Sequence, residues 1–174
     1  MEDLANLITE AQKGGKDAYG KIYELFYRRI FRYCSINTRK VEIAQDICQE
    51  TFLKAWKALP QFSQKGGSFQ AYLFKIARNL IIDLSRKHKE ESLENYQGIE
   101  TNEHFEEKIE KVEDTKRVQR ALSHLDDLER QIIILHYFED MTGREVAQVV
   151  GIKEGNLRVK THRVLEKLKE ILEK

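Results

Sequence analysis

Five side chains between residues 72 and 86 combine the chemical groups that bind an unpaired nucleic-acid strand. They are Tyr72, Lys75, Asn79, Asp83 and Arg86. On an α-helix these five fall within about 80° of one another, because each residue turns the helix by about 100°. An aromatic ring stacks on a base, cations bind phosphate, and an amide reads a base edge. The pattern therefore predicts a surface for single-stranded DNA, and its bland alternative is a solvated basic helix face.

An earlier segment, residues 44–59, carries a face that suits a protein partner. Its helical spacing gives an apolar stripe made of Ala44, Ile47, Cys48, Thr51, Phe52, Ala55 and Leu59. The opposite face is polar and contains Asp46, Gln49, Glu50, Leu53 and Lys57, with Trp56 at its margin. A leucine at the centre of a polar face beside a tryptophan indicates a docking site. One exposed leucine without any partner is the alternative.

The last helical segment, residues 154–172, carries a third candidate surface. Its inward side is predicted to consist of Leu157, Val164, Leu165, Leu168 and Leu172. Its outward side is predicted to consist of Arg158, Val159, His162 and Arg163, with Lys160 at the flank. Arginine is well suited to bidentate contacts with guanine in the major groove, so this side predicts binding to duplex DNA. A solvated basic face is again the alternative.

No group of residues predicts catalysis. The sequence lacks an HExxH motif, a phosphate-binding glycine loop and a nucleophile beside a base. Asp46 and Glu50 lie four residues apart and could share a metal, but no histidine or third acid joins them. We therefore expect no enzyme, no cofactor and no metal. Cys34 and Cys48 have no CxxC spacing and are interpreted as reduced, small hydrophobic residues of a cytoplasmic protein.

Composition favours a helical protein with two basic parts. The 174 residues allow one domain or two small ones, and a single proline favours long helices. Net charge is +7 over residues 1–89, −8 over 90–115 and +2 over 116–174. Two nucleic-acid-facing domains joined by an acidic linker would give this distribution, as would a solvated acidic loop between ordinary domains. No apolar run approaches the ~18 residues of a membrane span, and no signal peptide is expected.

Four helices are expected in the first part of the chain. A short helix carries Leu4, Leu7, Ile8 and Ala11 and stops at Gly14–Gly15, and a longer one begins near Asp17 with an apolar side that includes Leu25. Asn37 and Thr38 are predicted to cap the docking helix, which Pro60 ends. A loop over 61–68 then precedes a helix over 69–87, whose apolar side is predicted to contain Phe69, Leu73, Ile76, Ala77, Leu80 and Leu84.

The C-terminal part is predicted to be a helix-turn-helix domain. One helix carries Val118, Leu122 and Leu125 near its end, and the linker before it is expected to hold a frayed helix from His104 onward. Two capping boxes, Asp126 with Glu129 and Thr142 with Glu145, mark the next two helix starts. Small Ala147 lets the helices approach, and Gly151 supplies the turn between the final pair.

Three segments resemble, in order, motifs of the extracytoplasmic-function (ECF) group of bacterial sigma factors. Residues 44–56 resemble the core-binding motif A-x-D-x-x-Q-E-x-F-x-x-x-W, and residues 68–86 resemble S-F-x-x-W-L-x-x-I-A-R-N-x-x-x-D-x-x-R. The third match contains Glu145, Val146, Ala147, Gly151, Gly155, Asn156, Leu157, Arg158, Lys160 and Arg163. The resemblance implies an all-α fold of two small domains: a four-helix, region 2-type domain over 1–88, an acidic flexible linker over 89–115, and a region 4-type helix-turn-helix domain over 116–174.

The resemblance also assigns site residues. Those implied to bind polymerase are Asp46, Gln49, Glu50, Leu53 and Trp56. Those implied to bind the minus-ten element are Tyr72, Lys75, Arg78, Asn79, Arg86 and Lys87, with Asn79 contacting a flipped-out base held by the loop over 63–68. Those implied to bind the minus-thirty-five element are Asn156, Arg158, Val159, Lys160, His162 and Arg163. Asp83 is expected to be structural and to pair with a neighbouring cation.

The implied function is transcription initiation. The expected partners are core RNA polymerase (its β′ clamp helices and β flap), promoter DNA and an anti-sigma factor. A helix-turn-helix regulator that acts without polymerase is the alternative, although it leaves the face around Leu53 unexplained. The chain departs from the family pattern at several positions: Tyr72 replaces tryptophan, Lys153 a serine cap, Glu154 a proline and Val159 a serine, while Gly143 stands where an aromatic is frequent and Thr161 where an apolar residue is frequent.

Overall fold

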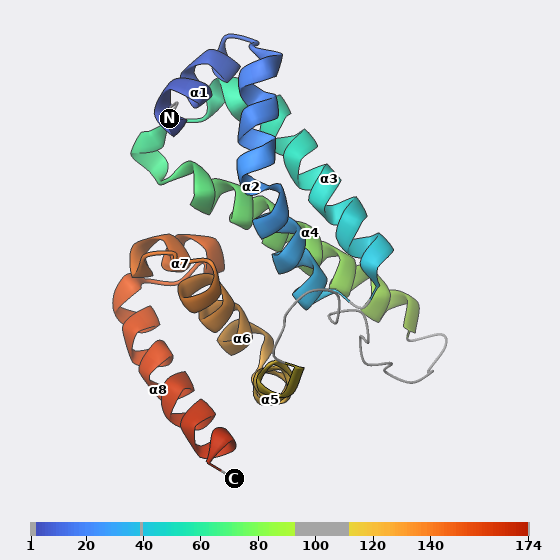
Figure 1. Cartoon of the computed structure of the whole chain (residues 1–174), viewed down its shortest axis with the longest axis vertical. Helices are drawn as coiled ribbons and strands as arrows, with labels where there is room; N and C mark the ends of the chain where they lie inside the picture. The colour runs from blue at the N-terminus through green and yellow to red at the C-terminus, as the bar shows by residue number, and fades with distance from the viewer. Residues whose placement is uncertain (1–2, 39, 93–111, 174) are drawn as a thin grey trace. The chain divides into compact units, whose positions relative to one another are not determined.

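The computed structural model describes residues 3–38, 40–92 and 112–173, and within these ranges every regular element is helical (Figure 1). The predicted all-α class is therefore confirmed. The chain divides into two compact units, unit 1 over residues 1–105 and unit 2 over residues 106–174. None of the described helices is long and apolar enough to cross a membrane.

The described residues of unit 1 form four α-helices and two short 3-10 turns. They are α1 (Leu4–Gln12), α2 (Lys16–Asn37), α3 (Val41–Ala58), η1 (Leu59–Gln61), η2 (Gln64–Gly66) and α4 (Phe69–Ser92). The helices α2, α3 and α4 pack against one another, and α1 covers the start of α2 (Figure 1). The apolar stripe predicted for α3 is confirmed, because each of its seven residues is buried.

Two predictions for the helices α2 and α3 are wrong. Asn37 and Thr38 do not cap α3. Their side chains donate to the carbonyl oxygens of Tyr33 and Cys34, so they lie at the end of α2. The residue before α3 is Lys40, whose side chain makes no cap hydrogen bond. Leu25 was expected on the apolar side of α2 but is 57% exposed, because the core side of α2 faces α3 and α4.

The core side of α4 is also rotated from its predicted position. Phe74 and Ile81 are buried, whereas Ile76, Leu80 and Leu84 are only half-buried. Two helices, α2 and α3, pack against α4. Its buried face is therefore wider than a single stripe and extends toward α2.

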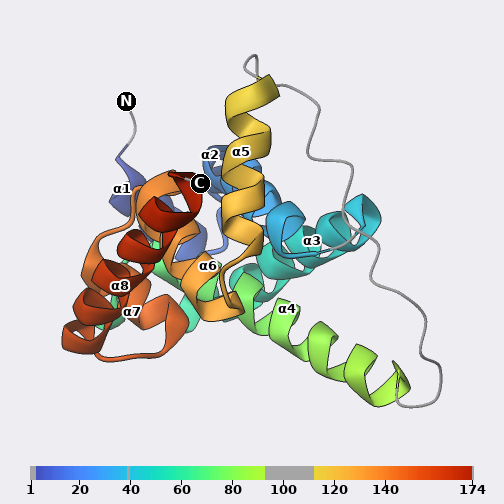
Figure 2. The same ribbon diagram turned by 90° about the horizontal axis from the view of Figure 1, so that it is seen from below.

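The described residues of unit 2 form four α-helices and one π-helical turn. They are α5 (Val112–Ser123), α6 (Asp127–Ile133), η4 (Ile134–Phe138), α7 (Gly143–Val150) and α8 (Glu154–Leu172). Figure 1 shows α5 end-on and Figure 2 shows it along its length. The helix α8 packs against α5, α6 and α7. The guanidinium of Arg117 on α5 donates to the carbonyl oxygen of Leu172 at the end of α8.

The helix starts of unit 2 follow the sequence closely. Both predicted capping boxes are present, Asp126 with Glu129 and Thr142 with Glu145. Gly151 ends α7 in the left-handed conformation with a φ of 76°, which glycine adopts at little cost. Lys153 precedes α8 without a side-chain hydrogen bond, as its departure from the serine cap predicts.

Other details of unit 2 differ from expectation. Leu165 is 39% exposed instead of buried. It lies about 80° around α8 from Leu157, outside the narrow side of α8 that packs on its neighbours. Leu125, which was expected near the end of the helix that carries Val118 and Leu122, is buried but follows the end of α5.

Helix occupies both ends of the segment predicted as a linker. The helix α4 continues to Ser92 and α5 begins at Val112. The rest of that segment, including the helix expected from His104 onward, lies outside the described residues.

Candidate protein and nucleic-acid interfaces

The docking face predicted on α3 is a continuous surface of one helix; by the docking face we mean Asp46, Gln49, Glu50, Leu53 and Trp56. Leu53 is 45% exposed, and the side chains of Asp46 and Gln49 around it are exposed as well. Glu50 is half-buried and pairs with Lys54 at 3.7 Å. The helix thus holds an apolar side chain in water among polar groups that a partner can hydrogen-bond.

The margin of this face is fixed by α2. Trp56 is half-buried, and its ring centroid lies 4.7 Å from that of Tyr19. The Tyr19 hydroxyl donates to the backbone oxygen of Phe52 at 2.5 Å, and burial raises the pKa of Tyr19 above its usual value. Sequence reasoning missed Tyr19 as the residue that positions Trp56.

The candidate DNA-binding side of α4 is mostly open. Lys75, Asn79, Arg86 and Lys87 are exposed, while Arg78 is half-buried. The predicted pairing of Asp83 is confirmed, because its carboxylate lies 3.9 Å from the Arg86 guanidinium. Lys75, Asn79 and Arg86 therefore lie on one accessible face of α4, and Arg78 and Lys87 lie on its two flanks.

Tyr72 is held by rings from two segments. Its centroid lies 5.0 Å from that of Phe62, in the loop before α4, and 5.9 Å from that of Phe69 at the start of α4. Tyr72 is half-buried, and burial raises its pKa. The ring proposed to stack on a base is thereby fixed against the loop proposed to hold that base.

The loop itself is anchored from α1. The side-chain amide of Gln12 donates to the backbone oxygens of Leu59 at 3.1 Å and Phe62 at 2.8 Å. Within the loop, the Ser63 hydroxyl accepts from the Lys65 amide, and the Ser68 hydroxyl accepts from the Ala71 amide at the start of α4. Sequence reasoning missed Gln12 and Phe62. They lie 50 residues apart in the sequence, so no local pattern connects them.

The third surface is the outward side of α8. Asn156, Arg158, His162 and Arg163 are exposed, and Val159 is 53% exposed. Lys160 is half-buried, in agreement with its predicted place at the flank. His162 lies 3.3 Å from the carboxylate of Glu166, one turn later on the same helix.

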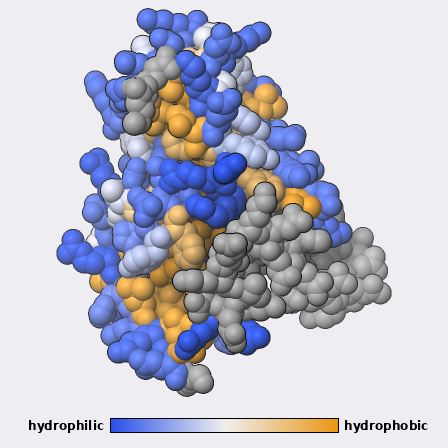
Figure 3. All heavy atoms as spheres, in the orientation of Figure 1, coloured by the Kyte–Doolittle hydropathy of each residue, from blue (hydrophilic) through white to orange (hydrophobic). Residues whose placement is uncertain are grey.

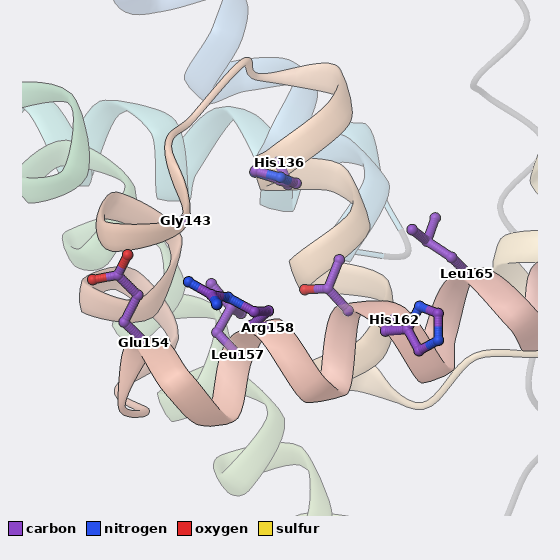
Figure 4. A pocket seen from close by; sticks show the side chains of 8 residues that line it. His136, Gly143, Glu154, Leu157, Arg158, His162 and Leu165 are labelled. Carbon is purple, nitrogen blue, oxygen red and sulfur yellow. The ribbon is translucent and has the colours of Figure 1, made fainter.

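A cavity of about 320 Å³ lies beside this surface, between α8 and η4 (Figure 4). Arg158, His162 and Leu165 line it from α8, and His136 lines it from η4. The Nδ1 atom of His136 lies 2.7 Å from the backbone oxygen of Met141, which fixes the ring. Figure 3 shows apolar surface beside α8 on the face of unit 2 turned to the viewer.

The predicted site residues thus fall into three groups. The docking face and the α4 surface belong to unit 1, on different helices, and the α8 surface belongs to unit 2. Among the residues that the structure describes, no three histidine, cysteine, aspartate or glutamate side chains group as a metal site requires.

Comparison with protein families divides the chain in the same way. The family described as "Sigma-70 region 2" matches residues 22–91, and the family described as "Sigma-70, region 4" matches residues 115–168. The first match contains the docking face and the α4 surface. The second contains both capping boxes and the α8 surface.

Curated proteins similar to this chain match it along most of its length. The ECF RNA polymerase sigma factor SigW of Bacillus subtilis is 28% identical over 177 residues, which cover 95% of this chain and 94% of SigW. SigM of the same organism is 26% identical over 87% of this chain and 93% of its own length. SigD of Mycobacterium tuberculosis is 28% identical over 97% of this chain and 84% of its own length.

Solved structures share the fold. CnrH, determined in complex with the cytosolic domain of CnrY, has 25% identity and a TM-score of 0.72 over 96% of this chain and 95% of that one. The sigma factor RpoE of Bartonella quintana, determined with the anti-sigma factor NepR, has 22% identity and a TM-score of 0.73 over 89% of this chain and 96% of that one.

The two matched regions, in this order and on these helices, define a sigma-70 type factor, a protein of RNA polymerase-dependent transcription initiation. Within that class, the curated relatives place the chain in the ECF group, and it belongs to that family. The resemblance seen in the sequence is confirmed.

Proposed function

We propose that each of the three surfaces has its own role in transcription initiation. The docking face binds the β′ clamp helices of core RNA polymerase. The α4 surface, with the loop over 61–68, captures the unpaired minus-ten strand, and the α8 surface reads the minus-thirty-five element. Residues 1–88 and 116–174 are the corresponding functional domains, with unit 2 also contacting the β flap.

The observation that favours this assignment most is the packing of the Tyr72 ring on Phe62. An exposed ring alone would suit many roles. A half-buried ring packed on Phe62, in a loop that Gln12 anchors, forms one wall of a preformed site for a base. Such a site favours melted DNA, because stacking of an unpaired base contributes about 1–3 kcal/mol.

The protein itself acts without catalysis in this proposal. Binding of flipped-out bases would stabilise the melted state, and the polymerase would carry out RNA synthesis. The site of action is the cytoplasm, where the polymerase works. A protein that covers the docking surfaces, an anti-sigma factor, is the expected regulator, since the solved relative CnrH forms a complex with the cytosolic domain of CnrY.

Transcription from genomic DNA fragments tests the proposal, because the fragments contain promoters whose sequence need not be chosen in advance. Core polymerase is incubated with the fragments, with and without this protein, and the transcript 5′ ends are mapped. We expect new start sites that share two upstream elements. Permanganate should detect unpaired thymines at the minus-ten element only when polymerase and protein are both present.

The same experiment separates the alternative. A helix-turn-helix regulator acting alone would bind duplex fragments tightly without polymerase and would create no new start sites with core polymerase.

A further inference from the structure

Four aromatic residues recur at every fourth position on α2, at the edge where α2 meets α3. This aromatic row consists of Tyr19, Tyr23, Tyr27 and Phe31. Residues four apart on a helix lie above one another on one side, so the rings form a continuous strip. None of the three surfaces described above includes Tyr23, Tyr27 or Phe31.

Ring contacts connect the row to the helix that carries the docking face. Tyr19 packs on Trp56 at 4.7 Å, and Tyr23 packs on Phe52 at 4.6 Å. From Tyr23 the row continues through Tyr27 at 5.1 Å to Phe31 at 5.9 Å. Gln49, Phe52 and Trp56 lie within about 60° of one another on α3. The row therefore lies along the side of α3 that carries Gln49 and Trp56, next to the docking face.

The row is only partly buried. Tyr23 is 36% exposed, and Tyr27 and Phe31 are half-buried. Core residues of the same helix, such as Ile22 and Ile30, are fully buried by comparison. The row thus presents aromatic surface to solvent beside the docking face. Tyrosine at such a place supplies apolar area and a hydroxyl, the combination that is enriched in interface hot spots.

The size of a protein interface gives a second argument. A stable interface buries roughly 800 Å² on each partner and takes about 20–30 residues from each side. The docking face has five residues on one helix, so a partner bound there must also cover neighbouring surface. On the Trp56 edge, that neighbour is the aromatic row.

We propose that the aromatic row is part of the polymerase-binding surface, with Tyr23 and Tyr27 in direct contact with the polymerase and Tyr19 positioning Trp56. This inference rests on the proposed docking of α3. The partner surface would place aliphatic or aromatic side chains against the rings and polar groups near the two hydroxyls.

Affinity of the full-length protein for core polymerase tests the proposal. Three variants are compared with wild type: the double variant Tyr23→Gln with Tyr27→Gln, the matched control Leu25→Gln, and Leu53→Glu. Leu25 is an exposed apolar residue on the other side of the same helix. We expect at least a tenfold loss of affinity for the double variant and less than a twofold loss for Leu25→Gln. An equal affinity of the double variant and wild type would overturn the inference, as would an equal loss in the Leu25→Gln control.

The Leu53→Glu variant separates this inference from the proposed function. If Leu53→Glu loses binding and the tyrosine variant keeps it, the docking face stands and the aromatic row is excluded. If Leu53→Glu binds like wild type, the docking assignment itself is wrong.

A footprint on the unmodified protein covers the case in which the tyrosine variant does not fold. Hydroxyl radicals oxidise accessible tyrosine rings, and mass spectrometry locates the oxidation. We expect core polymerase to reduce oxidation of Tyr23 and Tyr27 at least threefold and to leave Leu25 unchanged. Unchanged oxidation of both tyrosines in the complex would contradict the proposal. The Tyr27→Phe variant, which keeps the ring, should retain most of the affinity.

Discussion

In unit 1, the ring proposed to stack on DNA is held by side chains from another segment, whereas in unit 2 the residues proposed to read DNA stand on one helix. Tyr72 packs on Phe62, and the backbone of Phe62 is bound by Gln12 of α1. On α8, Arg158 and Val159 are exposed, and the helix is placed by the turn at Gly151 and by packing of its inner side.

This difference matches the two forms of DNA. An unpaired base is flexible and needs walls that are already in place, so that little entropy is lost when it binds. Duplex DNA is itself rigid, and a helix that projects into its major groove needs only correct side chains and correct placement. In the proposed function, unit 1 therefore binds an unpaired base against rings that are already in place, and unit 2 presents a helix to duplex DNA.

The largest expected effect is a loss of folding stability at alkaline pH that is confined to unit 1. Both cysteines of the chain lie in unit 1 and are fully buried. Burial raises the pKa of Cys48 from 9.0 to about 12 and raises the pKa of Cys34 as well. Each thiol ionises in the unfolded chain before it ionises in the folded one, so stability is fully present below pH 9 and is lost as the pH rises toward 12. The unfolding free energy of unit 1 should fall by about 1.4 kcal/mol per pH unit for each thiol.

Fluorescence of Trp56, the only tryptophan, reports unfolding of unit 1 alone. Urea unfolding at pH 8 and pH 11 should give a much lower midpoint at pH 11, and replacing both cysteines with alanine should reduce this dependence. Equal midpoints at the two pH values would show that the thiols do not couple to folding.

The second effect concerns the Tyr72 ring. Tyr72→Ala should slow formation of the open promoter complex by roughly 10- to 100-fold, since base stacking on an aromatic side chain contributes about 1–3 kcal/mol. Affinity for core polymerase should not change. Permanganate reactivity of the minus-ten thymines measures the rate. Tyr72→Trp, which restores the residue usual in the family, should melt DNA at least as well as wild type, and normal melting by Tyr72→Ala would refute the role of the ring.

The third effect concerns the presented helix. Arg158→Ala should reduce promoter binding by polymerase about tenfold, in line with about 1–3 kcal/mol for a bidentate contact to guanine. The loss should depend on one base pair of the minus-thirty-five element. On a promoter in which that base pair is changed, Arg158→Ala and wild type should bind equally. A uniform loss on all promoters would indicate a phosphate contact instead.

The smallest effect is a gain. Lys153 precedes α8 without a side-chain cap, and a serine there can accept a hydrogen bond from a free backbone amide of the first turn. Lys153→Ser should stabilise unit 2 by about 0.5–1 kcal/mol. Amide hydrogen exchange in α7 and α8 measures the change, and Trp56 fluorescence should detect none in unit 1. If Lys153→Ser leaves amide exchange in α7 and α8 unchanged, the amides of the first turn of α8 are already well solvated and the predicted gain is absent.

The sequence predicts best what depends on neighbours along the chain. Helical spacing identified the buried stripe of α3, and the pairs Asp126–Glu129 and Thr142–Glu145 identified two helix starts, because a capping box forms within one turn. Gly151 was identifiable for the same reason.

Contacts between distant segments were not predictable in this way. Gln12 and Phe62 lie 50 residues apart in the sequence, and no pattern connects them. Leu25 and Leu165 fit an apolar spacing but remain exposed, because helix packing covers only part of each stripe. The aromatic row had a visible signal, four rings at every fourth position, whose meaning depends on the placement of α2 beside α3.

The proposed docking of α3 on core RNA polymerase is tested by the affinity of the polymerase for the intact protein and for Leu53→Glu. Leu25→Glu is the matched control, because it places the same charge at an exposed leucine of the same unit. We expect tight binding by wild type and Leu25→Glu and a loss of at least about 30-fold for Leu53→Glu, as for an interface hot spot. Equal binding by Leu53→Glu and wild type would contradict the proposed docking.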